Sequence, residues 1–122
     1  ETGQNTGLSF RVADPSNFFF AYTSEGGDRS SPKTLTVGYY LNGVRTDLAS
    51  VPGLPNDPSN PWIMLRVLTY ADGRIQVFAG PALVFSTTSA VLSNSNGAGL
   101  YNNAAGLALT NRWDNFTILN AP

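Results

Sequence analysis

The 122-residue chain contains no cysteine and no histidine, and these two absences exclude several kinds of chemistry. Without cysteine there is no disulfide, no thiolate nucleophile and no cysteine-ligated zinc. Without histidine, neither a Ser-His-Asp triad nor a Cys-His pair can form, and the commonest ligand of zinc and copper is missing. The absence of cysteine does not fix the compartment, because proteins of oxidising compartments also occur without it.

Charge is scarce as well, since only 12% of the residues are charged and the net charge is −1. The seven basic residues are spread singly, so no basic stripe can neutralise several phosphates. No apolar run approaches the length that spans a bilayer. We therefore expect no nucleic-acid partner and no membrane insertion, and the composition is typical of a secreted or cell-surface β-rich module.

Paired carboxylates are also missing. A glycosidase on a β-strand needs two acids at i and i+2 or i+4, so that both point to one face. No two acids of this chain have that spacing, and most lie in predicted turns, where aspartate accepts local backbone hydrogen bonds. The eight acids are Glu1, Asp14, Glu25, Asp28, Asp47, Asp57, Asp72 and Asp114. We therefore expect a binding module and not an enzyme.

What the sequence does contain is short strands separated by turn signals. Alternating apolar and polar residues predict strands over residues 8–12, 18–23, 34–41, 44–48, 62–70, 74–79, 83–85, 98–102 and 112–119. Asn42-Gly43 favours a type I′ hairpin turn, because both central residues must reach positive φ. The proline-rich stretch 51–61 predicts a long connection, and 86–97 a loop with one helical turn.

These elements predict an all-β fold, an antiparallel two-sheet β-sandwich, with a small closed barrel as the alternative. Residues 1–3, Glu1-Thr2-Gly3, resemble the remnant that a secretion vector leaves, so we assign a single domain to residues 4–122. The predicted core positions are Leu8, Phe10, Leu35, Val37, Leu65, Val67, Ile75 and Val77.

The residues that alternate with this core are candidates for a ligand site. Sugars bind to aromatic ring faces and to planar hydrogen-bonding groups. We expect one outer surface to carry Arg11, Thr36, Tyr40, Arg66, Gln76 and Phe78, and we name Arg11, Tyr40, Arg66, Gln76 and Phe78 as candidate ligand-binding residues. The alternative is that they form the ordinary outer side of a sandwich. Phe18, Phe19 and Phe20 cannot all enter one core, so at least one points away from it.

The order of several segments carries a resemblance to a known family. The segments are "GLSFRVADPSNFFFAY", "LTVGYYLNGVRTDLAS", "WIMLRVLTYADGRIQVFAG", "GAGLYNN" and "RWDNFTIL". Over residues 7–119 the chain resembles the concanavalin A-like lectin and glucanase superfamily, in its laminin-G-like branch. The resemblance implies a jelly roll of two curved antiparallel sheets whose concave face often receives glycans. It also implies an N-terminal segment that nothing before Gly7 supplies, so we expect that this segment was removed or that another chain completes the sheet.

The resemblance further implies a structural calcium ion. In this superfamily an aspartate of the last strand often binds calcium together with backbone carbonyls, which makes Asp114 the candidate metal ligand. The alternative is that Asp114 pairs with Arg112 or accepts backbone N–H bonds.

Two functions from different classes remain open. The first is a non-catalytic carbohydrate-binding module that holds glycan or polysaccharide on a concave sheet face. The second is a module for protein–protein adhesion or assembly, including a homodimer, that uses an open edge strand or an apolar patch at Phe18–Phe20. A purely structural spacer is a third interpretation.

Overall fold

The computed structural model describes residues 5–24, 33–54 and 64–102, and all regular structure in these residues is β. The strands are β1 (Asn5–Asp14), β2 (Asn17–Ser24), β3 (Lys33–Leu41), β4 (Val44–Leu54), β5 (Leu65–Thr69), β6 (Arg74–Ala79), β7 (Ala82–Thr88) and β8 (Gly97–Asn102). No helix among these residues is long and apolar enough to cross a membrane.

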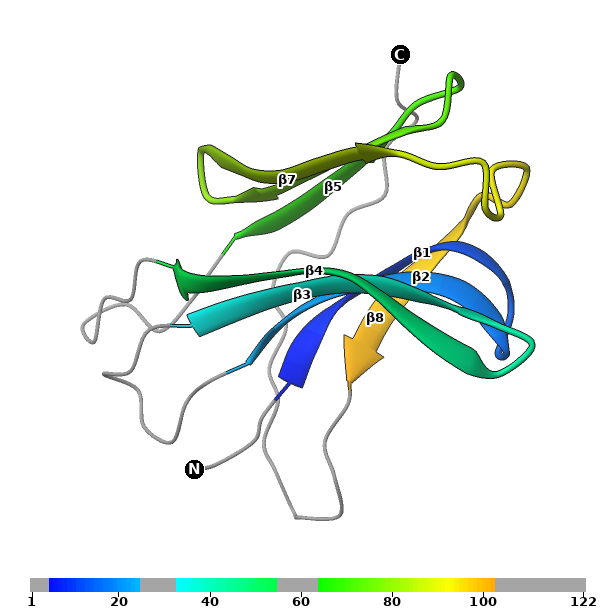
Figure 1. Cartoon of the computed structure of the whole chain (residues 1–122), viewed down its shortest axis with the longest axis horizontal. Coiled ribbons are helices and arrows are strands. Elements are labelled where there is room, and N and C mark those ends of the chain that lie inside the picture. Colours follow the sequence, from blue (N-terminus) through cyan, green and yellow to red (C-terminus); the bar gives the residue numbers. More distant parts are fainter. Residues whose placement is uncertain (1–4, 25–32, 55–63, 103–122) are drawn as a thin grey trace.

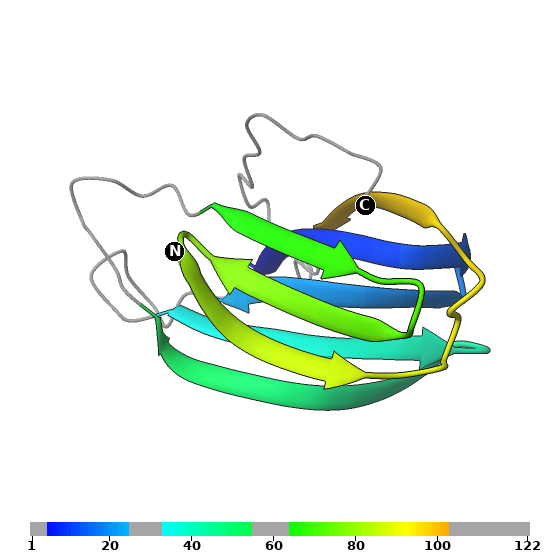
Figure 2. The same cartoon turned by 90° about the horizontal axis from the view of Figure 1, so that it is seen from above.

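The eight strands form two antiparallel sheets. One has five strands in the order β4-β3-β2-β1-β8, and the other has three in the order β5-β6-β7. Figure 1 shows the smaller sheet lying over the larger one, and Figure 2 shows the same two layers from above. Consecutive strands pair as hairpins within each sheet, whereas β8 returns to the larger sheet and pairs with β1. The predicted all-β class and the two antiparallel sheets are confirmed.

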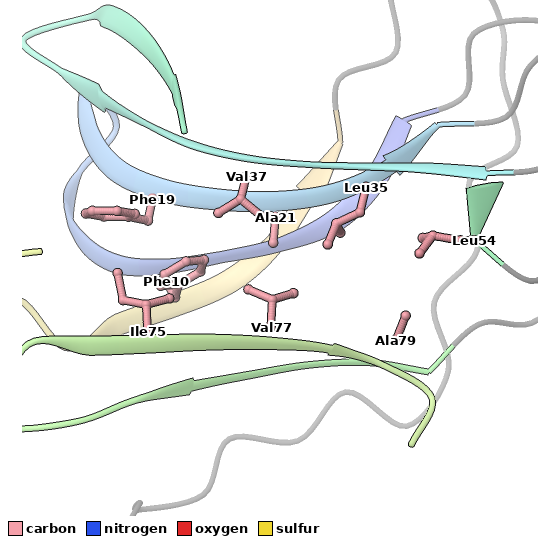
Figure 3. Packing of buried hydrophobic residues seen from close by; sticks show 9 residues of the cluster. All are labelled: Phe10, Phe19, Ala21, Leu35, Val37, Leu54, Ile75, Val77 and Ala79. Atoms are coloured by element: carbon pink, nitrogen blue, oxygen red, sulfur yellow. The ribbon is translucent and has the colours of Figure 1, made fainter. Parts of the chain in front are cut away.

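The core lies between the two sheets and draws on both. The buried cluster is Phe10, Phe19, Ala21, Leu35, Val37, Leu54, Ile75, Val77 and Ala79. In Figure 3, Ile75, Val77 and Ala79 of β6 point toward the larger sheet, whose apolar side chains point back at them. Leu65 and Val67 are partly buried against this cluster. Seven of the eight predicted core positions therefore pack together, and Leu8 is half-buried outside the cluster.

The Asn42-Gly43 turn has the predicted geometry. Asn42 has φ of 51° and Gly43 has φ of 79°, which are the positive values that a type I′ turn requires. A hydrogen bond from the Gly43 amide to the Ser16 carbonyl (3.0 Å) ties this turn to the β1–β2 turn. The two hairpins of the larger sheet are thereby held together at one end.

The predicted boundary of β4 is wrong. The alternation predicts a strand over 44–48 followed by a connection, whereas β4 continues to Leu54. Pro52 is tolerated because no described strand pairs with the other side of β4, so the missing N–H breaks no ladder between described strands. Gly53 has φ of 74°, and the register with β3 shifts beside it, so a bulge absorbs the irregularity.

The two adjacent rings Phe18 and Phe19 give a test of this architecture. Phe19 is fully buried in the core, whereas Phe18 is half-buried on the opposite face of β2. We expect Phe19→Ala to lower the free energy of unfolding by about 3–5 kcal/mol, because it leaves a cavity that the sheets cannot close. Phe18→Ala should cost under about 2 kcal/mol. Urea denaturation of both variants measures the difference, and equal losses would contradict the assigned faces.

Candidate functional site

The candidate ligand residues do not share one surface. Tyr40 lies on the outer face of the larger sheet. It is paired with Phe18, which points away from the core, and its neighbour Tyr39 packs against the core. Arg66, Gln76 and Phe78 lie on the outer face of the smaller sheet, because Val67, Ile75 and Val77 occupy the core face. The expectation of a single surface is therefore wrong: the two groups look away from each other, with the core between them.

Arg66, Gln76 and Phe78 lie beside one another on their own sheet, as the alternation predicts. Arg66 is opposite Phe78 across the β5–β6 pair, and its guanidinium carbon lies 4.4 Å from the centre of that ring. Gln76 is engaged as well, because its Oε1 accepts a hydrogen bond from the Tyr70 hydroxyl (2.8 Å). These side chains are satisfied within the protein, as in the ordinary outer side of a sandwich.

Arg11 is not on a surface at all. Its residue is 4% exposed, and its guanidinium donates to the backbone carbonyls of Ser89 (2.9 Å), Val91 (3.0 Å) and Gly73 (3.2 Å). It also lies 5.4 Å from the centre of the Phe19 ring. These acceptors belong to the segments that flank the smaller sheet, so Arg11 joins β1 to the opposite layer.

The physical reason for this misplacement is a bulge. Arg11 has φ of 46°, and the register of β1 shifts at this point against both neighbouring strands. The extra residue reverses the alternation, so a side chain expected outside turns inward. Burial lowers the pKa of Arg11, and no carboxylate among the described residues pairs with it. Backbone carbonyl dipoles stabilise its charge instead.

Five aromatic side chains gather on the outer surface of the larger sheet, which we call the aromatic face: Phe18, Phe20, Tyr22, Tyr40 and Tyr101. They come from β2, β3 and β8. The strands β3 and β4 bend away from the smaller sheet toward the Asn42-Gly43 turn (Figure 1), so this outer surface is concave along them. Tyr40 is the one predicted ligand residue that belongs to it.

The rings of the aromatic face are packed against one another. Phe20 stacks on Tyr101 with centroids 5.4 Å apart, and Tyr22 stacks on the same ring at 5.6 Å. Glycines make room for these rings: Gly7 lies between Tyr22 and Tyr101 in the register, and a Cβ on Gly38 would come within 2.7 Å of the Phe20 ring. Stacked and tilted pairs at these distances stabilise the layer beyond the area they bury.

The aromatic face has a buried floor and an accessible rim. Phe20 is 0% exposed and Tyr22 is 7% exposed, whereas Phe18, Tyr40 and Tyr101 are half-buried. The expected apolar patch at Phe18–Phe20 is therefore wrong, because Phe19 is in the core and Phe20 is covered. The other three rings are the part of the aromatic face that a ligand can reach.

Arg45 supplies the charged group of this face. Its guanidinium carbon lies 4.8 Å from the Phe20 centroid, its Nη2 donates to the Tyr22 hydroxyl (2.7 Å), and its Nε donates to Asp47 Oδ1 (2.6 Å). The hydrogen bond to Asp47 raises the pKa of Arg45. A fixed guanidinium beside ring faces offers the planar donors that hydroxyl recognition requires.

An open hollow of about 270 Å³ lies at the β1–β2 end of the aromatic face. It is lined by Ser9, Val12, Asp14, Pro15, Phe18, Leu100 and Tyr101. Hydrogen bonds from the Asn17 side chain and the Ser16 backbone lower the pKa of Asp14, so this carboxylate is ionised and accepts hydrogen bonds near neutral pH. The hollow therefore combines apolar walls with an acceptor.

The predicted calcium site cannot be compared with the structure. Asp114 and its neighbour Arg112 lie outside the described residues. Among the residues that are described, no three side chains of His, Cys, Asp or Glu come together as a metal site would require.

Comparisons with known proteins add no relative to this picture. No family model matches the chain, no curated protein matches it, and no solved structure matches it. The site must therefore be interpreted from its own geometry.

Phe18, Tyr22, Tyr101 and Arg45 were not predicted as members of one face. A usable signal was present: Phe18, Phe20 and Tyr22 recur at every second position of one strand, which predicts a second aromatic surface opposite the core. Arg45 could be found from the predicted Asn42-Gly43 hairpin, because a two-residue turn places it opposite Tyr40. Tyr101 could not be found in the same way, because β8 lies far from β1 in the sequence and meets it only in the sheet order.

Arg11 gives a prediction that separates structural from binding roles. Arg11→Met removes the side-chain donor from three backbone carbonyls, of which only Gly73 keeps another donor among the described residues, the Ser89 amide (2.9 Å). We therefore expect the free energy of unfolding to fall by about 2–4 kcal/mol. Arg66→Met, on an exposed position over Phe78, should change it by less than about 1 kcal/mol. Thermal and urea denaturation test this, and an Arg11 variant as stable as the native chain would contradict the buried network.

Tyr101 makes stability depend on alkaline pH. Burial, with a smaller contribution from Tyr40, raises the pKa of Tyr101 from its usual value near 10 to about 12. The unfolded chain then loses this proton first, so the contribution of Tyr101 is complete below about pH 10 and is lost as the pH rises toward 12. We expect the denaturation midpoint to fall less steeply over this window in Tyr101→Phe. Equal slopes for both proteins would show that this hydroxyl is not buried in the fold.

Proposed function

We propose that this protein is a non-catalytic carbohydrate-binding module, and that glycan binds on the aromatic face of the larger sheet. The observation that carries the proposal is the combination of half-exposed rings at Phe18, Tyr40 and Tyr101 with the fixed guanidinium of Arg45. Ring faces contact the apolar C–H side of a sugar, and planar polar groups bond its hydroxyls. The concave outer surface and the adjoining hollow support the same proposal.

The non-catalytic part of the proposal rests on the available side chains. Histidine and cysteine are absent from the whole chain. Asp47 and Asp72 pair with Arg45 and Arg74, and Asp14 accepts hydrogen bonds within its own turn. No pair of described carboxylates is therefore free to act as acid and nucleophile, as glycoside hydrolysis requires.

The proposal also covers the family and the cellular setting. The motif order of the sequence and the two antiparallel sheets support a concanavalin A-like jelly roll from a secreted or cell-surface protein. Among the described strands, only β8 returns to the larger sheet after the chain has formed the smaller one. A crystal structure of the whole chain in which no further strand crosses between the sheets would contradict the jelly roll. The structural calcium ion at Asp114 stays a prediction, which thermal denaturation with calcium and with chelator tests.

Adhesion or assembly through protein contacts is the second candidate function. The observation that favours it is the apolar surface of the edge strand β4, where Val44 is 67% exposed and Leu48 is 39% exposed. This function needs no sugar ligand.

A glycan array followed by titration of the bound sugars tests the proposed function. We expect saturable binding that weakens by at least about tenfold in Tyr40→Ala and in Phe18→Ala, since each removes a ring face. Phe78→Ala is the matched control, because it removes a ring from the outer face of the smaller sheet. A cooperative unfolding transition in urea confirms that each variant is folded before binding is measured.

The outcomes are distinct. Binding that is lost in Phe78→Ala and kept in Tyr40→Ala would move the site to the other sheet and contradict the assignment of the aromatic face. No binding to any glycan on the array would contradict the carbohydrate function itself.

A further inference from the structure

The edge of the larger sheet carries an unusual segment at the start of β4. No described strand pairs with the far side of β4, and the residues from Val44 to Leu48 are exposed or half-exposed. Two of these residues are apolar: Val44, which is 67% exposed, and Leu48, which is 39% exposed. An open strand edge with apolar side chains is a template on which another strand can pair.

The sequence of this segment is complementary to itself. Val44-Arg45-Thr46-Asp47-Leu48 is apolar at both ends and carries opposite charges at equal distances from Thr46. When a second copy of the segment runs antiparallel with the two threonines opposite each other, Arg45 faces Asp47 and Val44 faces Leu48. Directly opposed residues of antiparallel strands interact, and opposite charges stabilise the pair.

The rest of β4 limits the pairing to this segment. The β3–β4 register shifts between Asp47 and Ala49, which makes Leu48 the bulged residue, and Pro52 lacks the N–H that a longer ladder would need. A ladder that begins at the Asn42-Gly43 turn therefore ends near Leu48. The short match gives a defined register and a small interface.

We propose that two copies of this protein associate through antiparallel pairing of Val44–Leu48 about a two-fold axis at Thr46. The same patch then serves both partners, so the contact closes at a dimer and does not extend into a fibre. Charge complementarity selects the second copy as the occupant: Arg45 of each copy meets Asp47 of the other in addition to its own Asp47 partner.

The pairing has a consequence for the aromatic face. Residues directly opposite each other in a ladder share one face of the sheet, and Arg45 lies on the outer face with Tyr40. The aromatic faces of both copies therefore point to the same side. If the proposed glycan function also holds, a polysaccharide chain would meet two sites, which raises avidity without any new contact.

Mixing two charge-reversed variants tests the pairing. R45D places two acids against two acids in its own dimer, and D47R places two arginines against two arginines, so we expect neither to self-associate. In an equimolar mixture the acids of R45D face the arginines of D47R, and the heterodimer should form. The native chain should show reversible association that grows with protein concentration in sedimentation velocity. Both variants lose the ion pair within the strand, so recovery in the mixture can come only from pairing between chains.

A second pair of variants covers the case in which charge reversal impairs folding. Val44→Lys places a charge at an already exposed position and should weaken association at least tenfold. Leu83→Lys on β7, at another exposed apolar position, should leave association unchanged. The proposal is overturned if the native chain stays monomeric at every concentration, if Val44→Lys associates like the native chain, or if folded R45D and D47R show no association on mixing. Glycan titration at low protein concentration reports the proposed function separately, because a monomer retains a whole aromatic face.

Discussion

The constraint on which the described structure depends is that the central strand β2 is buried on both faces. Phe19 and Ala21 point into the core, while Phe20 and Tyr22 point to the other side, because successive residues of a strand alternate. The smaller sheet covers the first pair. The second pair is covered by aromatic rings of the same sheet and by Arg45, so the aromatic face contributes to the stability of the fold by itself. Phe18, Tyr40 and Tyr101 are the partly exposed rings of this packed layer.

A period of two predicts much of this fold and also explains where the prediction fails. Ile75 and Val77 in the core, with Gln76 and Phe78 outside, follow from the pattern of one strand alone, as does the Asn42-Gly43 turn. The pattern says nothing of which sheet a strand joins. Tyr40 and Phe78 each follow a residue that packs in the core, so each points away from the core. They nevertheless lie on opposite sides of the molecule, because β3 and β6 belong to different sheets. Sheet membership is set by long-range pairing, which no short window of sequence contains.

The conformation of Arg11 could not be predicted from its local sequence. A non-glycine residue at positive φ is uncommon, and the turn residues nearest to Arg11, Asp14-Pro15, come only three residues later. The conformation persists because three carbonyls of distant segments accept its hydrogen bonds and the Phe19 ring lies beside it. The side chain thus helps to hold the two layers in register. Its conformation can be understood only once both layers are in place.

The two sheets are unequal in size, and this difference links the aromatic face to the strand edge. Among the described strands three lie over five, and Val44 at the β4 edge is exposed while the centre of the larger sheet is buried. Arg45 belongs to both regions, because it lies over Phe20 and Tyr22 and is also the charged member of the self-complementary segment. A ligand that holds Arg45 against the rings and a second copy that draws it toward another Asp47 therefore act on one guanidinium. Since coupling between two binding events is reciprocal, glycan binding and dimerisation, where both occur, must change each other's affinity by the same factor.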